Sequence, residues 1–369
     1  MRFSIFTHAE HKIYRGDIYA YAPYVREMNF WISHFDEVVV LGPGSEYKVD
    51  KIDLRYEHKK IKLQPLPFLH FKNLRYTLKS ITNSVLVVSK IFSEMHTTDH
   101  IHIRCPGNIG FLACLVQIFF PLKQKTVKYA GNWDLESRQP LSYKIQKWIL
   151  SNTFLSRNIK VLIYGKWNNL NNNIIPFFTA TYSEKEKAHV KKKFEMPYKF
   201  LFVGSIVDGK RPLLSLKIVH GLIKKGVDAR LDIYGKGERD DQLSEYILKN
   251  DLQGVVTMHG NQDSVILKEA YKSSHFSILP SKSEGWPKAL AEAMFFGCIP
   301  IATSVSCVPW MLNDEKRGIL IEPQLDYAVP KISEFLENPD LLDSMSSRAM
   351  EWSQQYNIEK FKVEIQKLL

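Results

Sequence analysis

The sequence predicts an α/β protein made of two domains, each built around a parallel sheet. Two observations lead to this prediction: short apolar, β-type runs alternate with helical stretches twice along the chain, and a polar, charged segment separates the two series. Parallel strands need crossover connections, and these are usually helices that cover the sheet. The chain has 369 residues, enough for two domains of about 100–200 residues each.

The first series predicts a domain over residues 1–175. Its expected strands are residues 2–7, 37–41, 100–104, 125–130 and 160–164, and its expected helices are residues 19–34, 73–95, 109–120 and 141–155. The run EVVVL is expected to end as a strand at the turn residues Gly42, Pro43 and Gly44. An Asn-rich stretch and a charged tract follow, and they predict a linker over residues 176–198.

The second series predicts a domain over residues 199–350. Its expected strands are residues 200–204, 230–234, 255–259, 275–279 and 299–302, and its expected helices are residues 212–225, 238–249, 264–273, 287–296, 329–337 and 341–355, with a last helical stretch at 358–369. Residues 351–369 are expected to cross back to the first domain.

Composition narrows the class of protein. Lys and Arg number 50 against 39 Asp and Glu, a net charge of +11 that suits an anionic partner: nucleic acid, a membrane surface or a phosphorylated substrate. The four cysteines have no CxxC spacing, so neither a zinc cluster nor a disulfide framework is expected, and a reducing cytoplasm fits. The first residues lack the apolar segment of a signal peptide, and no apolar stretch reaches the roughly 20 residues of a membrane span.

The most informative segment is LPSKSEGWPKALAEAMFFGCIPIAT, residues 279–303. Pro287 suits the first turn of a helix because it lacks a backbone N–H, and Gly297 suits the end of that helix. A helix that starts at the carboxyl end of a parallel strand offers backbone N–H groups to phosphate. Glu284 and Glu292 could accept hydrogen bonds from the hydroxyls of a sugar and a ribose. Either glutamate alone is more simply a surface charge, but the whole pattern is specific.

This segment resembles the retaining nucleotide-sugar glycosyltransferases of family 4, whose signature E-x7-E has the spacing of Glu284 and Glu292. The resemblance is close over residues 199–325 and loose over the first half. It implies the GT-B fold, two facing Rossmann-like domains with a cleft between them. It also implies that Glu284 contacts the donor sugar and Glu292 the nucleotide ribose. The further donor contacts implied are the backbone at Gly285, Trp286 and Pro287 and the N–H groups of Ala289 and Leu290.

A second match to this family is FVGSIVDGKRP, residues 202–212. Lys210 stands where the family has a lysine, whose positive charge would neutralise the departing nucleotide diphosphate. Ser205 stands where the family usually has an arginine, so the second cation is either Arg211 or a residue of the first domain. The other donor-binding candidates by resemblance are Gly204, Gly235 and His259.

The first domain is expected to bind the acceptor. In DHIHIRC, residues 99–105, His102 keeps the first histidine of a family pattern and Arg104 replaces the second. Arg104 could reach a phosphate or a sugar carboxylate, which makes it a catalytic candidate beside Lys210 and Glu284, or it could pair with a nearby acid. The other acceptor-binding candidates are Asn132 and Asp134, which follow the next expected strand, and Gly16, which loosely matches a family loop.

Basic and apolar residues are interleaved in KKIKLQPLPFLHFKNLRYTLK, residues 59–79. Such a tract could lie on an anionic membrane and receive a lipid-linked acceptor. It could equally be a surface loop and helix whose apolar side packs on the sheet.

The sequence therefore predicts a retaining glycosyltransferase that moves a sugar from a UDP- or GDP-sugar to a hydroxyl of a glycan or lipid-linked glycan, in bacterial surface polysaccharide synthesis. It is expected in the cytoplasm, either free or on the inner face of the cytoplasmic membrane. No metal or other cofactor is expected, because no suitable carboxylates cluster, and no nucleic-acid partner, because the basic residues are dispersed. The alternatives are a GT-B nucleotide-sugar epimerase or hydrolase and a non-catalytic, glycan-binding protein of the same fold.

Overall fold

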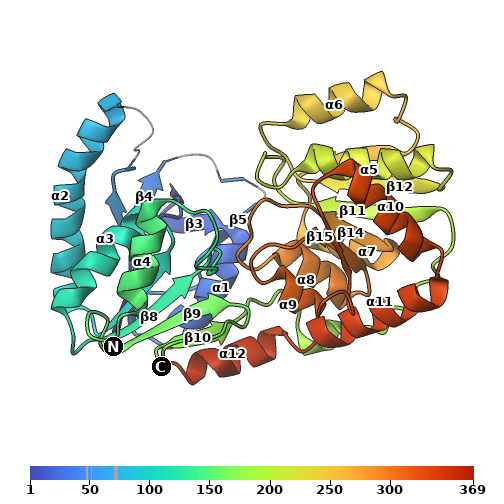
Figure 1. The fold of residues 1–369 in the computed structure, drawn as a ribbon. Coiled ribbons are helices and arrows are strands. Elements are labelled where there is room, and N and C mark those ends of the chain that lie inside the picture. Colours follow the sequence, from blue (N-terminus) through green and yellow to red (C-terminus); the bar gives the residue numbers. More distant parts are fainter. Residues whose placement is uncertain (47–48, 51, 70–73) are drawn as a thin grey trace. The chain divides into compact units, whose positions relative to one another are not determined.

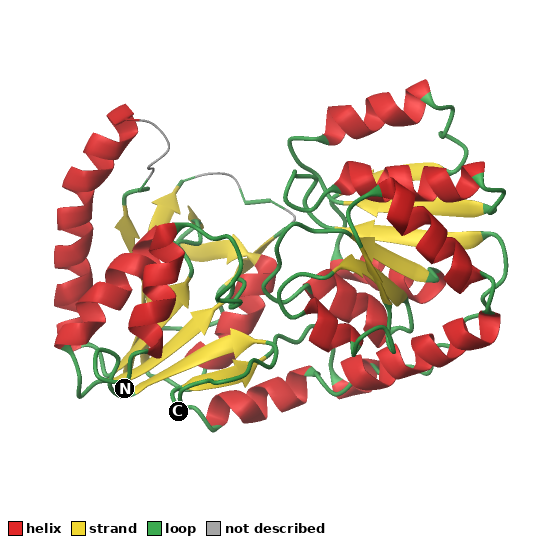
Figure 2. Ribbon diagram, viewed as in Figure 1, coloured by secondary structure: helices red, strands yellow, loops and turns green. Residues whose placement is uncertain are grey.

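The computed structural model describes residues 1–46, 49–50, 52–69 and 74–369. The chain forms two compact units (Figures 1 and 2). The first unit comprises Met1–Phe178 together with Lys362–Leu369, and the second comprises Thr179–Phe361. Among the described residues, no helix combines the length and hydropathy needed to cross a bilayer.

The first unit contains a ten-stranded sheet, ordered β10-β9-β8-β7-β1-β4-β2-β3-β5, with β6 also paired to β4. Pairing is parallel from β10 to β4 and for β6, because the connections between these strands cross over the sheet. β3 pairs antiparallel with both β2 and β5. The strands are β1 Arg2–Phe6, β2 His11–Tyr14, β3 Asp17–Tyr21, β4 Glu37–Ser45, β5 Asp53–Arg55, β6 Ile61–Leu66, β7 His100–Cys105, β8 Gln124–Tyr129, β9 Ile159–Tyr164 and β10 Ile174–Phe177.

Three helices of the first unit, α2, α3 and α4, pack side by side over one face of this sheet (Figure 1). Their inward side chains share an apolar core with the strands, since Ile91, Ala113 and Ile149 pack with Ile103 and Val127. The helices are α1 Ala22–Ile32, α2 Leu74–Thr97, α3 Asn108–Val116, the 3₁₀ turn η1 Gln117–Phe119 and α4 Leu141–Ser151.

The second unit has a six-stranded parallel sheet, ordered β13-β12-β11-β14-β15-β16. Helix α5 packs with α6 and α10, and α8 packs with α7 and α11. The strands are β11 Tyr198–Val203, β12 Ala229–Tyr234, β13 Val256–Gly260, β14 Phe276–Leu279, β15 Ile299–Thr303 and β16 Ile319–Ile321. The helices are η2 Glu184–Glu186, α5 Pro212–Lys224, α6 Asp240–Lys249, α7 Ser264–Ser273, α8 Lys288–Phe295, α9 Val308–Leu312, α10 Leu325–Leu336, α11 Pro339–Ser353 and α12 Ile358–Gln366, whose last residues belong to the first unit.

The expected helix over residues 19–34 is wrong in its first residues, which belong to a β-hairpin. β2 and β3 pair antiparallel, and α1 begins at Ala22. Arg15 and Gly16 make the turn with φ of 53° and 85°, and two successive positive φ values match the twist of a tight hairpin. The usual Asn-Gly or Asp-Gly signal is absent, so the sequence pattern did not reveal the turn.

Other boundaries also differ from the prediction. β4 continues through Gly42 and Gly44 instead of ending there; a Cβ at Gly42 would lie 3.0 Å from the carbonyl oxygen of Thr7. β10 takes up Pro176 and Phe177, which were assigned to the linker, because a proline is tolerated on an edge strand. The expected helices 109–120 and 141–155 end early, and β5, β6, α9 and β16 were not predicted. In the tract 59–79, β6 covers the start, while residues 70–73 lie outside the described residues.

Candidate functional site

Two loops meet at the carboxyl edge of the second sheet. One connects β11 to α5 and the other connects β14 to α8, and their strands are parallel neighbours. The Lys210 Nζ lies 2.6 Å from Oε1 of Glu284, and the Lys282 N–H donates to the carbonyl oxygen of Gly209 at 2.8 Å. The side chain of Glu284 is 7% exposed and that of Lys210 is 31% exposed. The fold thus brings together the cation and the carboxylate that the two sequence motifs singled out.

Arg211, the other predicted cation in this loop, holds the loops together. Its φ of 50° is left-handed, and its guanidinium donates to the carbonyl oxygens of Pro280 and Ser281 at 3.3 and 3.4 Å. Ser205, where the family usually has an arginine, is exposed. Lys210 is therefore the residue of this loop whose charge faces a carboxylate at the edge of the sheet.

The glycine turn after β12 crosses the loop after β11 at close range. Gly204 donates its N–H to the carbonyl oxygen of Tyr234 at 3.0 Å, and Ile206 donates to Lys236 at 3.1 Å. Gly235 has a φ of 138°, and a Cβ there would lie 1.9 Å from the carbonyl oxygen of Gly204. Gly235 therefore has a structural role in addition to any role in binding.

His259 stacks on an aromatic ring at the same edge. Its ring lies 4.3 Å from that of Tyr234 with an interplanar angle of 6°, and its Nε2 is 2.6 Å from Oδ1 of Asp232. The Asp232 contact was not predicted, although its position two residues before Tyr234 places both side chains on the same side of β12. Tyr234 is buried, so the His259 ring, 30% exposed, is the member of this pair that a planar ligand could reach.

Glu292 has a different set of partners from Glu284. The Thr181 hydroxyl donates to its Oε1 at 2.7 Å, the Tyr271 hydroxyl donates to its Oε2 at 3.0 Å, and the Lys288 Nζ lies 3.8 Å from Oε1. Burial raises the pKa of Tyr271 well above its ordinary value, so its hydroxyl stays protonated and donates. Each carboxylate oxygen keeps a lone pair for a further donor. Glu292 lines a small pocket with Trp286.

The loop before α8 is held by an aromatic cluster. Trp286 is 6% exposed and packs against the rings of Trp310, Trp352 and Tyr356 at centroid distances of 6.2, 6.0 and 5.5 Å. The Cys307 thiol donates to the carbonyl oxygen of Gly285 at 3.1 Å. The Trp286 side chain is thus part of the core.

The two predicted N–H donors in the first turn of α8 differ in their hydrogen bonds. The Leu290 N–H donates to the carbonyl oxygen of Pro287 at 3.0 Å, and the Leu290 side chain is buried. Ala289 is half-buried, and no acceptor for its N–H is found within the described part of the chain. Of the two, Ala289 is the N–H donor that a diphosphate could reach.

The candidate site residues of the first unit differ in how deeply they are buried. His102 is 1% exposed, its Nδ1 bonds with the Thr126 hydroxyl at 2.9 Å, and its ring packs on Trp31. The acceptor contact expected of His102 is therefore wrong, because a core ring cannot meet a substrate. Arg104 is half-buried, with its guanidinium 4.6 Å from the ring centroid of Tyr24.

The remaining acceptor candidates lie in turns. Asn132 accepts the N–H of Asp134, Asp134 accepts that of Glu136, and Gly16 sits in the β2–β3 turn. No group of three or more metal-ligating side chains is present in the part of the chain that the structure describes.

One protein-family model matches this chain, and its match lies within the second unit. Residues 183–352 match the family Glycosyl transferases group 1. An uncharacterized glycosyltransferase of Haemophilus influenzae is 31% identical over 43% of this chain and 45% of its own length, and a putative colanic acid biosynthesis glycosyltransferase, WcaL of Salmonella typhimurium, is 28% identical over 42% and 40%. The aligned part thus spans about half the length of the curated relatives or less.

Solved structures resemble the whole chain at low sequence identity. Sucrose-phosphate synthase from Thermosynechococcus elongatus has a TM-score of 0.69 at 16% identity, and HepE from Anabaena, in complex with UDP and glucose, has a TM-score of 0.68 at 11% identity. Each match covers 100% of this chain and 98% of the other. This chain therefore matches the group 1 glycosyltransferases over residues 183–352, and its two parallel-sheet units have the GT-B fold.

Proposed function

We propose that this protein is a retaining glycosyltransferase that moves a sugar from a nucleotide diphosphate donor to a hydroxyl of a glycan or lipid-linked glycan. The observation that supports this most is the 2.6 Å contact between Lys210 and Glu284 beside the start of α8. A cation, a carboxylate and a helix N-terminus then lie along one sheet edge, and they suit the diphosphate and the attached sugar of one donor molecule.

In this mechanism the protein positions the donor and stabilises the leaving group. Lys210 and the Ala289 N–H face the diphosphate and offset the charge that grows on it as the glycosidic C–O bond breaks. Glu284 accepts hydrogen bonds from the sugar hydroxyls, and Glu292 accepts them from the ribose. The acceptor hydroxyl attacks from the face that the leaving group departs, and its proton passes to the diphosphate oxygen. No protein nucleophile is required.

Chemistry and resemblance together support the donor and acceptor classes that we propose. The partly exposed ring of His259, stacked on Tyr234, suits a nucleobase. HepE binds UDP and glucose, and WcaL is named for colanic acid synthesis. We therefore propose UDP- or GDP-sugars as the donors and bacterial surface polysaccharides as the products.

An assay of nucleotide diphosphate release tests this function. Each UDP- and GDP-sugar is incubated with the protein, with and without a mixture of glycan acceptors, and the anomeric configuration of the product is read by NMR. The proposal expects release that depends on the acceptor and a product with the donor's configuration. Equal release without acceptor would favour a hydrolase, a changed donor sugar without net release would favour an epimerase, and an inverted product would exclude retention.

The substitution Tyr271→Phe tests how Glu292 is held. The buried Tyr271 hydroxyl donates to its carboxylate, and a hydrogen bond to a charged group contributes about 1.5–3 kcal/mol. Calorimetry is expected to show nucleotide affinity weakened by about tenfold. Tyr246→Phe, which removes a hydroxyl bonded to His220, is the matched control. Unchanged affinity in Tyr271→Phe, alongside lower stability, would make this tyrosine structural alone.

A further inference from the structure

The outer surface of the α2–α3–α4 layer carries large apolar side chains exposed to solvent. We call this surface, residues 82–97, 108–122 and 141–157, the helical face (Figure 1). Apolar residues on a surface helix normally point toward the core. The most exposed of those pointing outward are Val85 at 69%, Leu86 at 62%, Phe119 at 72%, Leu122 at 89%, Leu141 at 72%, Trp148 at 63% and Phe154 at 72%.

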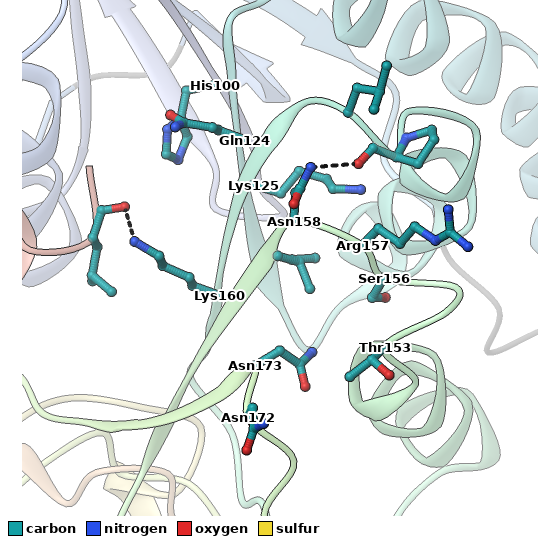
Figure 3. A pocket seen from close by; sticks show the side chains of 14 residues that line it. His100, Gln124, Lys125, Thr153, Ser156, Arg157, Asn158, Lys160, Asn172 and Asn173 are labelled. Atoms are coloured by element: carbon teal, nitrogen blue, oxygen red, sulfur yellow. Dashed lines mark hydrogen bonds between the residues drawn. The ribbon is translucent and has the colours of Figure 1, made fainter.

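Some of these side chains are linked across the helices. Phe119 in η1 meets the ring of Phe92 on α2 at a centroid distance of 6.4 Å. Leu122 lines a hollow of about 840 Å³ together with Arg157, whose guanidinium lies 4.9 Å from the ring centroid of Phe154. Figure 3 shows Arg157, Asn158 and other polar side chains around this hollow, at the start of β8 and β9. The apolar side chains thus extend from α2 to the end of α4.

The charged residues around the helical face are mostly basic. Residues 100–183 contain ten Lys and Arg against two Asp and Glu. The side chains that line the hollow include Lys125, Arg157 and Lys160 and no Asp or Glu. The Nζ atoms of Lys125 and Lys160 bond to backbone carbonyl oxygens, whereas Arg157 and Lys144 are exposed. Cations among exposed aromatic and aliphatic side chains are the pattern of a surface that rests on anionic lipid headgroups.

We propose that the helical face docks on an anionic phospholipid bilayer, with Phe119, Leu122, Trp148 and Phe154 entering the interface and Lys144 and Arg157 facing headgroup phosphates. The cores of protein–protein interfaces are depleted of charged residues, and the cations interspersed here favour lipid as the occupant. This surface is distinct from the donor site and does not depend on the proposed function.

Vesicle flotation tests the proposal. The full chain is mixed with vesicles of phosphatidylcholine, either alone or containing phosphatidylglycerol. Binding to the anionic vesicles that weakens with added salt is expected. The double variant Phe119→Ser/Trp148→Ser is expected to lower partitioning onto the vesicles by about tenfold, because it removes two rings whose transfer into the interface favours binding. Val265→Ser, which removes an apolar side chain 69% exposed on α7, is the matched control and should bind as the wild type does.

Three results would overturn the proposal: no binding of the wild type, equal binding to neutral vesicles, or wild-type binding by the double variant. Self-association of the wild type in light scattering, abolished by the double variant, would assign the face to a second copy instead. Nucleotide calorimetry on the same variant checks its folding. If the protein binds vesicles but no nucleotide, the proposed function fails and the docking surface stands. If it binds nucleotide but no vesicles, the docking surface fails and the proposed function stands.

Discussion

Lys210→Ala is expected to lower the rate of sugar transfer by about 10²–10³-fold, the usual effect of removing one preorganised stabiliser of transition-state charge. The reason is the position of the Nζ, which faces the sheet edge beside Glu284 and the start of α8. The loss should fall on kcat more than on KM, because the charge on the leaving diphosphate grows as the bond breaks. Steady-state kinetics with a fixed acceptor measures both.

Two further variants make the Lys210 result specific. Lys282→Ala removes an exposed lysine from the neighbouring loop and should leave kcat unchanged. Lys210→Arg keeps the charge and should recover part of the rate. Lys210→Ala also leaves the buried carboxylate of Glu284 without its cation, so urea unfolding must accompany the kinetics. A folded Lys210→Ala protein with a wild-type kcat would remove Lys210 from the mechanism.

Gly235→Ala is expected to reduce the free energy of unfolding by about 3 kcal/mol or more, because an alanine is strained at this backbone conformation and its Cβ collides with another loop. The φ of Gly235 is 138°, and its Cβ would lie 1.9 Å from the Gly204 carbonyl oxygen. A backbone atom cannot swing aside as a side chain can, so the loops after β11 and β12 must separate. Urea unfolding of the full chain measures the loss.

Gly226→Ala is the matched control for this prediction. Gly226 also has a positive φ, 89°, but a Cβ there would meet no atom within 4 Å. Its cost is therefore the conformational strain alone, about 1 kcal/mol. Equal losses in the two variants would show that the crossing of the two loops contributes nothing to stability.

The sequence assigned Lys210 and Glu284 to one donor site, whereas it gave no information on the surroundings of Glu292. Lys210 and Glu284 follow strands of one parallel sheet, and the carboxyl ends of parallel strands share an edge, so motifs far apart in sequence could be joined. Thr181 and Tyr271 gave no such signal. Thr181 lies before the first strand of the second sheet, and Tyr271 occupies a buried position of α7 that any apolar residue would fit.

The first unit was harder to predict because local patterns there compete with tertiary structure. His102 matched a family position, yet its alternation with Ile101 and Ile103 in a central strand puts it in the core on the opposite face. The Arg15–Gly16 turn uses an unusual pair, and β10 contains Pro176, which argues against a strand unless the strand lies at an edge. In each case the structure depends on which strands pair in the sheet, and a single sequence does not show that pairing.

Calorimetric titration of UDP, GDP and their sugar conjugates into the wild type and Glu292→Ala tests the central claim most directly. Glu269→Ala, which removes an exposed carboxylate from α7, is the control. We expect one nucleotide series to bind the wild type and Glu269→Ala alike, and Glu292→Ala to lose that binding while it stays folded. Absence of binding to every nucleotide, or equal binding by Glu292→Ala, would contradict the assignment of this sheet edge as a nucleotide-sugar site.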